Sequence, residues 1–330
     1  MEYRKLGRTD IEVSTICLGC WALIGGHTWG PQDRDESAAT IRAAFDAGIT
    51  FFDTAPAYGD GESEALLGKA LADVRKDAVI ATKVSGSQLA PEDVARSCDR
   101  SLRLLGTDVI DLLQVHWPRA DIPLADTLGA MQRLQEAGKV RAIGVSNFGT
   151  SYLGEAAELA RIETNQLCYS LLWRAIEHEI QPLCTAGEIG ILCYSPLCQG
   201  LLTGKFATVD DVPEGRARSR LFSKDRPQAR HAEPGCEAEV FAAVDETRRI
   251  AEGLSLPMAH VALAWLLARD AVTSVIAGAR NPEQARQNAR AGEVKLPAST
   301  IEELAAATDE VKAHIGPNAD MWQTDSRMER

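Results

Sequence analysis

Long apolar runs are missing from this chain of 330 residues. No stretch approaches the roughly 18 unbroken apolar residues of a membrane-spanning helix, and the N-terminus MEYRKLGRTD lacks the apolar centre of a signal peptide. We therefore expect a soluble, cytoplasmic protein with no membrane partner.

Positive charge is scarce, since 35 Lys and Arg residues face 47 Asp and Glu residues and the formal net charge is −12. A nucleic-acid surface needs concentrated cations, so no nucleic-acid partner is expected. One segment, GRARSRLFSKDRPQAR from Gly215 to Arg230, is basic and departs from the rest. We interpret it as a candidate lid over an anionic ligand, with a solvated loop as the alternative.

Metal-binding and disulfide patterns are also lacking. The six histidines form no HExxH motif, and no cluster of His and carboxylates has metal-ligand spacing, so no metal is expected. Eight cysteines in so long a chain do not make a disulfide scaffold. Cys17 and Cys20 form a CxxC pair, but no second pair follows at zinc spacing, and the surrounding apolar run predicts a strand.

The glycine fingerprint of a dinucleotide-binding turn is incomplete. In FFDTAPAYGDGESE, Gly59 and Gly61 have the right spacing, but Glu64 stands where the third glycine belongs. A glutamate there would also put negative charge where a pyrophosphate should sit. The phosphate interpretation is therefore disfavoured, and Asp53 and Tyr58 become the residues of interest in this turn.

What the sequence does contain is an alternation of apolar runs and amphipathic helical patterns, repeated eight times. Apolar strands each followed by a helix indicate a parallel sheet covered by helices, and eight units favour a (β/α)8 TIM barrel of the α/β class, a single domain over residues 1–330. The strands are predicted at Thr15–Gly19, Thr50–Thr54, Ala78–Val84, Val109–His116, Val140–Ser146, Ile162–Cys168, Ile191–Tyr194 and Ser274–Ala277.

Three additions are expected around this barrel. A turn at Gly7–Asp10 predicts an N-terminal hairpin across the barrel floor, and a long insertion, roughly Cys198 to Leu256, follows the seventh strand. An extra C-terminal helix, STIEELAAATDEVKAHIG, precedes the tail PNADMWQTDSRMER.

Polar residues gather where the predicted strands end, the edge at which barrels of this kind carry their chemistry. Asp53 ends the second strand, Tyr58 follows in its loop, Lys83 ends the third strand and His116 ends the fourth. Each has a plain structural alternative: a loop cap, a surface aromatic, an ion-pair partner and a core histidine.

Together these four residues have a chemical logic. A carbonyl that accepts hydride needs a proton donor at its oxygen, and a tyrosine can serve if a neighbouring cation lowers its pKa. Lys83 can supply that cation, Asp53 can pair with the lysine, and His116 can orient the carbonyl.

The chain resembles the aldo-keto reductase superfamily over nearly its whole length. The segments that carry the resemblance are ITFFDTAPAYGDGESEALLGKAL, VIATKV, DLLQVHWP, GKVRAIGVSNF, QLCYS, CYSPLCQGLLTGKF and IAGARNPEQARQN. The resemblance implies that Asp53, Tyr58, Lys83 and His116 are the catalytic tetrad, with Tyr58 as general acid toward a carbonyl.

The resemblance also implies NADPH or NADP+ bound across the barrel mouth. Its nicotinamide would contact Ser146, Asn147, Gln166 and Tyr194, its pyrophosphate would contact Ser195, Pro196, Leu197, Gln199, Gly200, Leu201, Lys205 and Arg216, and its adenosine end would contact Gly278, Arg280, Gln284 and Asn288. Arg280 suits a 2′-phosphate and favours NADPH over NADH. Ala277 departs from the family pattern, which often has proline there.

The substrate is expected to be a small carbonyl compound held by aromatic walls, with Trp21, Trp29 and Trp117 as candidates together with Tyr58 and Trp322. Core packing is preferred for Trp265. Two other functions stay open: a non-catalytic NADP(H)-binding regulatory or sensor module, and a barrel isomerase or aldolase in which Lys83 is nucleophile or base.

Overall fold

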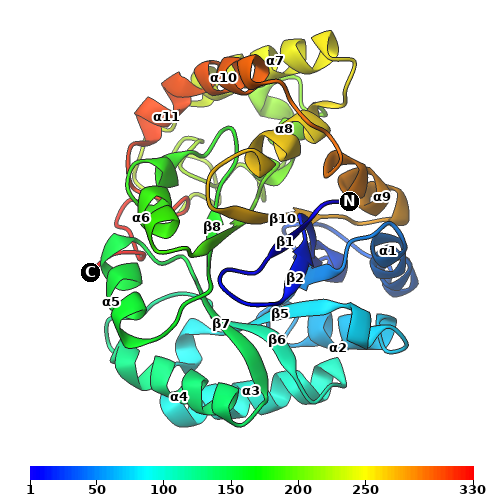
Figure 1. Cartoon of the computed structure of the whole chain (residues 1–330). Helices are drawn as coiled ribbons and strands as arrows, with labels where there is room; N and C mark the ends of the chain where they lie inside the picture. Colours follow the sequence, from blue (N-terminus) through cyan, green and yellow to red (C-terminus); the bar gives the residue numbers. More distant parts are fainter.

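The chain, described here by a computed structural model of all 330 residues, forms a closed barrel of eight parallel strands (Figure 1). The strands are β3 (Ile16–Gly19), β4 (Phe51–Asp53), β5 (Val79–Val84), β6 (Ile110–Val115), β7 (Val140–Ser146), β8 (Thr164–Cys168), β9 (Gly190–Tyr194) and β10 (Val272–Gly278). The barrel closes by pairing β10 with β3. The predicted (β/α)8 fold is confirmed.

One helix covers the outside of the barrel after each strand. These helices are α1 (Arg34–Asp46), α2 (Glu62–Ala70), α3 (Pro91–Leu105), α4 (Leu124–Glu136), α5 (Thr150–Leu159), α6 (Ile180–Ala186), α8 (Met258–Leu267) and α9 (Pro282–Ala291). Asp33 and Asn281 cap α1 and α9 by accepting hydrogen bonds from backbone N–H groups of the first turn. The capped start of α9 stands directly after β10, at the mouth of the barrel.

The predicted hairpin closes one end of the barrel. β1 (Tyr3–Lys5) and β2 (Glu12–Ser14) pair antiparallel, and Figure 1 shows them in dark blue across the barrel. Leu6, Ile11 and Val13 are buried against inward-facing strand residues, which are Cys17, Phe51, Val79, Ala81, Leu112, Ala142, Leu192 and Ile276. Apolar packing therefore fills this end of the barrel and leaves the other end for polar groups.

The long insertion contains a helix that the sequence analysis did not single out, α7 (Glu237–Gly253). The middle of the basic segment is anchored, because Arg220 donates hydrogen bonds to the carbonyl oxygens of Asn318, Asp320 and Ile315. Leu221 and Phe222 beside it are buried in the main core. A lid movement would therefore be confined to the parts of the segment on either side of this anchor.

The extra C-terminal helix is two helices, α10 (Ala298–Ala306) and α11 (Asp309–Ile315), where one was predicted. Arg174, from the loop after β8, donates hydrogen bonds to the carbonyl oxygen of Ala305 and to Oγ1 of Thr308. Thr308 Oγ1 also contacts the carbonyl oxygen of Leu304. These bonds take the backbone acceptors that a continuous helix would use, and the helix breaks there.

The C-terminal tail returns to the barrel and is held at α5. Asp320 is fully buried and accepts two hydrogen bonds from the Arg327 guanidinium, at 2.8 and 2.9 Å. Glu329 accepts from the backbone N–H of Ser151 at 2.9 Å and caps α5. The tail thereby brings Trp322 and Arg327 to the mouth of the barrel.

No single helix has the length and apolar character needed to cross a membrane. α7 and α8 meet that description only when taken together, and they are bent by 95° at the break between them.

We predict that Leu6→Ala destabilises the protein by about 2–5 kcal/mol, the usual cost of a cavity left by a buried leucine. Leu6 is fully buried among the residues that fill the closed end of the barrel. Urea unfolding measures the change, with Glu12→Ala as the control, because Glu12 is solvent-exposed on the same hairpin. A Leu6→Ala loss within 0.5 kcal/mol of the control would contradict the role of the hairpin as a plug.

Candidate active site

Side-chain alternation along the strands sets the position of the site. Phe51, Ala81 and Leu112 face the barrel interior, so the residues two positions later in each strand face it as well. These are Asp53, Lys83 and Gln114, and all three are buried. The strand register places Asp53 beside Ala81 and Lys83 beside Gln114. Polar groups therefore collect one layer above the apolar plug.

The turn after β4 presents Tyr58. Gly59, Asp60 and Gly61 have φ angles of 64°, 50° and 89°, so three consecutive residues are left-handed. Glycine adopts this conformation without steric cost, which explains two glycines in so short a turn. The Thr54 hydroxyl donates to Ser63 Oγ at 2.9 Å across the base of the turn. The turn thereby aims the phenol at the barrel axis.

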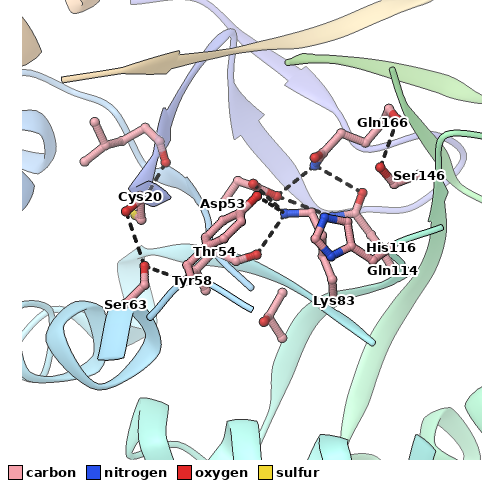
Figure 2. A network of polar contacts seen from close by, with 12 residues as sticks. Cys20, Asp53, Thr54, Tyr58, Ser63, Lys83, Gln114, His116, Ser146 and Gln166 are labelled. Atoms are coloured by element: carbon pink, nitrogen blue, oxygen red, sulfur yellow. Dashed lines mark hydrogen bonds and ion pairs between the residues drawn. The ribbon is translucent and has the colours of Figure 1, made fainter. Parts of the chain in front are cut away.

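Lys83 lies at the centre of the polar contacts drawn in Figure 2. Its Nζ donates to Asp53 Oδ1 at 2.7 Å, to the Thr54 carbonyl oxygen at 2.9 Å and to the Tyr58 hydroxyl at 3.4 Å. The side chain is fully buried. Burial lowers the pKa of Lys83, but the negative charge of Asp53 and the hydrogen bonds to Asp53 and Tyr58 outweigh it and raise the pKa above its ordinary value. A protonated lysine with three acceptors is a poor nucleophile, which argues against the aldolase alternative.

The direction of the Tyr58 pKa differs from the sequence expectation. We expected the cation of Lys83 to lower it, but burial raises the pKa of Tyr58 and Lys83 offsets only part of the rise. Asp53 adds to the rise, because its negative charge lies near the phenol. The phenol therefore stays protonated, and able to donate, throughout the neutral pH range.

His116 follows β6, and its ring lies edge-on to that of Tyr58 with centroids 6.2 Å apart. Burial, assisted by the charge of Lys83, lowers the pKa of His116 to about 3. The imidazole is therefore neutral near pH 7. A neutral ring still carries one N–H donor, so His116 can hold an oxygen at the position to which Tyr58 points.

Amide side chains extend this network, and Figure 2 shows two of them, Gln114 and Gln166. Gln166 donates from Nε2 to Asp53 Oδ2 at 2.8 Å, and Asn147 donates from Nδ2 to Ser146 Oγ at 3.0 Å. The Tyr194 hydroxyl donates to Asn147 Oδ1 at 2.9 Å. Gln114, which the sequence analysis missed, donates to Asp53 Oδ2 at 3.4 Å. Its position two residues before His116, near the end of β6, was the available signal.

A cavity of about 870 Å³ opens above this network and is lined by nearly all of the expected site residues. Of the expected catalytic residues, Lys83 lies beneath the wall of the cavity, and Leu201 of the expected cofactor residues lies in the apolar core. The expected residues on the wall are Asp53, Tyr58, His116, Ser146, Asn147, Gln166, Tyr194, Ser195, Pro196, Leu197, Gln199, Gly200, Lys205, Arg216, Gly278, Arg280, Gln284, Asn288, Trp21, Trp29 and Trp117.

Three cations, Lys205, Arg216 and Arg280, meet at one side of this cavity. Burial, with the charges of Arg216 and Arg280, lowers the pKa of Lys205 to about 8. Nε of Arg216 and both polar side-chain atoms of Gln199 are buried without a hydrogen-bond partner. Unpaired cations and orphaned polar groups in a cavity fit an anionic, hydrogen-bonding ligand. The residues present are therefore suited to the phosphates of a nicotinamide cofactor.

Left-handed backbone also occurs at this cavity wall and directly beside it. Asn147, Ser195, Cys198 and Gln199 have φ angles of 60°, 51°, 46° and 55°, although none is glycine. Such conformations cost free energy and persist where the surrounding structure requires them, often at ligand sites. The backbone directly after β7 and directly after β9 therefore adopts this costly conformation beside Tyr194.

The aromatic part of the cavity wall is accompanied by more charged side chains than we expected from the sequence. Trp21 stacks on Tyr58 with centroids 6.0 Å apart, and Trp29 packs edge-on against Trp21 at 5.3 Å. Residues that the sequence analysis did not place here also line the cavity, and they include Arg218, Gln228, Arg230, Gln323 and Arg327. Trp322 lines the cavity, whereas Trp265 is fully buried in the core as predicted.

The CxxC pair has no redox geometry. Cys17 belongs to the apolar cluster inside the barrel and Cys20 belongs to the outer core. All eight cysteines are buried and free.

We predict that His116 makes the folded protein sensitive to acid. Its folded pKa of about 3 lies below the unfolded value, so the unfolded state binds the extra proton and stability falls as pH drops below about 6.5. Between pH 7 and pH 5, wild type should lose up to about 2 kcal/mol more than His116→Gln. Urea unfolding of both proteins at the two pH values measures this. Equal losses would contradict an imidazole that is neutral in the folded protein.

Comparisons with known proteins agree with this architecture. The model of the aldo/keto reductase family matches residues 15–309. The chain is 38% identical over 298 residues to the aldo-keto reductase YhdN of Bacillus subtilis (strain 168), covering 86% of each chain. It is 34% identical over 336 residues to the NADH-specific methylglyoxal reductase of Escherichia coli (strain K12), covering 94% of this chain and all of that one.

Among solved structures, the chain is similar to an aldo-keto reductase from Klebsiella pneumoniae in complex with NADPH. The TM-score is 0.73 and the identity 27%, and the match covers 92% of this chain and 94% of that one. Tyr58, Lys83, Asp53 and His116 thus stand at the mouth of a barrel that matches this family in both sequence and fold. The chain belongs to the aldo/keto reductase family, whose members are oxidoreductases acting with a nicotinamide cofactor.

Proposed function

We propose that the chain is a single-domain, cytoplasmic enzyme that reversibly reduces aldehyde or ketone carbonyls to alcohols with NADPH, and that Tyr58 is its general acid. The observation that carries this proposal is the contact of the Tyr58 hydroxyl with Lys83, itself paired with Asp53, at the base of the cavity. A cytoplasmic location accords with eight free thiols, because cysteines stay reduced in that compartment.

The cofactor, when bound, supplies the hydride that the carbonyl carbon accepts. Residues Ser146, Asn147 and Gln166 would hold its nicotinamide amide, and Tyr194 would lie against the ring. Lys205, Arg216 and Arg280 would take its phosphates. Gln166 already donates to Asp53, so its remaining oxygen can accept an amide N–H.

The proton follows a short path in this proposal. The Tyr58 hydroxyl passes its proton to the carbonyl oxygen as the carbon gains the hydride, so the product is a neutral alcohol and Tyr58 becomes a phenolate. Lys83 stabilises that phenolate, because its protonated Nζ lies 3.4 Å from the oxygen. The neutral His116 donates its N–H to the same carbonyl oxygen and fixes its position.

We predict that Tyr58→Phe lowers kcat by about 10²- to 10⁴-fold, the usual effect of losing a general acid. The cofactor dissociation constant should change less than about threefold, because the phenol makes no necessary contact with the cofactor in this proposal. NADPH oxidation with a panel of aldehydes gives kcat, and fluorescence titration gives the dissociation constant.

Two results would count against this assignment. Reduction by Tyr58→Phe at the wild-type rate would remove Tyr58 as the acid. A wild-type protein that binds NADPH but reduces no carbonyl in the panel would favour the cofactor-binding regulatory or sensor module. Because the pKa of Tyr58 is raised, carbonyl reduction should persist to at least about pH 10, the ordinary pKa of a phenol, and fall only above it.

The choice of NADPH over NADH is assigned to Arg280. Its Nε donates to Gln32 Oε1 at 2.9 Å, while Gln32 Nε2 donates back to the Arg280 carbonyl oxygen at 2.8 Å. This reciprocal pair fixes the guanidinium beside Lys205 and Arg216, where its charge contributes to the lowered Lys205 pKa. A fixed guanidinium suits bidentate binding of a 2′-phosphate.

We predict that wild type binds NADPH more tightly than NADH by about 1.5–3 kcal/mol, the range for hydrogen bonds to charged groups. Arg280→Ala should remove most of this difference, because it weakens the binding of NADPH and leaves the affinity for NADH nearly unchanged. Fluorescence titration of both proteins with both cofactors provides the measurement. Equal wild-type affinities would overturn the assignment.

A further inference from the structure

The wall of the cavity carries six cationic side chains but only two carboxylates, Asp53 and Glu283. The cations are Lys205, Arg216, Arg218, Arg230, Arg280 and Arg327. Asp53 is paired with Lys83, and Arg327 is paired with Asp320 from behind the wall. Since the chain as a whole is acidic, this excess of positive charge is local to the cavity.

The cations fall into two groups. Lys205, Arg216 and Arg280 interact with one another, and the Arg216 guanidinium lies over the Trp29 ring at 5.4 Å. Arg218 lies over a different indole, Trp322, at 4.6 Å. Burial lowers the pKa of Arg218, and the charge of Arg230 lowers it further, which places Arg230 nearby.

Apart from the Trp322 ring, Arg218 has no carboxylate or hydrogen-bond partner in the protein. No Asp or Glu oxygen lies within 4.0 Å of its guanidinium, and its Nε is buried without a hydrogen bond. Other arginines of the same segment are satisfied: Arg220 pairs with Glu233 at 2.7 Å and Arg226 with Glu237 at 2.9 Å. A half-buried guanidinium with free donors on a cavity wall is suited to an anion from solution.

Arg218 borders the side of the cavity that the C-terminal tail forms. Trp322 comes from the C-terminal tail, and Arg327 of the same tail lies 3.8 Å over the ring of Trp117, the residue after His116. Arg218 is therefore connected through the tail to Trp117, which follows His116 of the tetrad and lines the same cavity. An anion at Arg218 would belong to the molecule whose carbonyl meets Tyr58.

We propose that Arg218, with Arg230 beside it, binds an anionic group of the carbonyl substrate, so that the preferred substrates are aldehydes or ketones bearing a carboxylate or phosphate. The inference rests on the proposed carbonyl reduction and specifies its substrate class. Arg218 binds the substrate in this proposal, and Tyr58 remains the general acid.

The test compares substrates that differ in one anionic group. 4-Carboxybenzaldehyde is paired with methyl 4-formylbenzoate, succinic semialdehyde with butanal, and glyceraldehyde 3-phosphate with glyceraldehyde, all with NADPH. We expect wild type to show a KM at least about tenfold lower for the charged member of the carboxylate pairs or of the phosphate pair, consistent with charge-assisted hydrogen bonds. The pair that responds identifies the anion.

Variants assign the effect to Arg218. Arg218→Met should raise KM for the preferred charged substrate about tenfold or more and leave the neutral member unchanged, while Arg218→Lys keeps part of the preference. Lys224→Met is the matched control, because Lys224 is an exposed cation of the same segment that lies off the cavity wall. Lys224→Met should leave the KM of every substrate unchanged.

A binding measurement keeps the test independent of turnover. Calorimetry on the NADP+-saturated protein should show 4-(hydroxymethyl)benzoate binding at least about tenfold more weakly to Arg218→Met than to wild type. The NADPH dissociation constant should stay within threefold. Weaker NADPH binding without a change in substrate preference would assign Arg218 to the cofactor and overturn the inference.

The remaining outcomes separate the two proposals. Wild-type reduction of neutral and charged members with equal KM would overturn the anionic substrate class and leave carbonyl reduction standing. Failure to reduce any of the six compounds, with no binding of 4-(hydroxymethyl)benzoate, would overturn both.

Discussion

The buried ion pair of Lys83 and Asp53 is the interaction on which the site depends. Two charges removed from water cost several kcal/mol each unless their remaining hydrogen-bonding capacity is used, and here it is. Asp53 accepts from Gln166 as well as from Lys83, and Lys83 reaches Thr54. The pair thereby links β4, β5 and β8 at one level of the barrel, and loss of either partner would leave an unpaired buried charge.

Charge is distributed unevenly over the molecule. The chain carries a net charge of −12, yet its cavity wall is rich in arginine. A cationic cavity in an acidic body concentrates anions at its mouth and disfavours their binding elsewhere on the surface. Two separate cationic groups within one cavity allow one anion to be recognised beside Arg280 and another beside Arg218.

Much of the fold was predictable because apolar strands and amphipathic helices alternate with regular spacing. The polar strand ends were predictable for the same reason, since side-chain direction in a strand follows from position alone. The break at Thr308 was not, because its cause is Arg174, distant in the sequence. The direction of the Tyr58 pKa could not be predicted from the sequence either, because the burial of this side chain depends on how the turn folds against Lys83 and Trp21. Sequence likewise could not show that a carboxylate pairs with Arg327 and that none pairs with Arg218.

The hairpin that closes one end of the barrel has a consequence for the order of events at the other. Leu6, Ile11 and Val13 leave no passage through the barrel interior, so everything that reaches Tyr58 arrives and departs through the same mouth. Two molecules that share such an opening must bind and leave in a fixed order. Whichever lies deeper must enter first and leave last, so the upper molecule sets how long the lower one is retained.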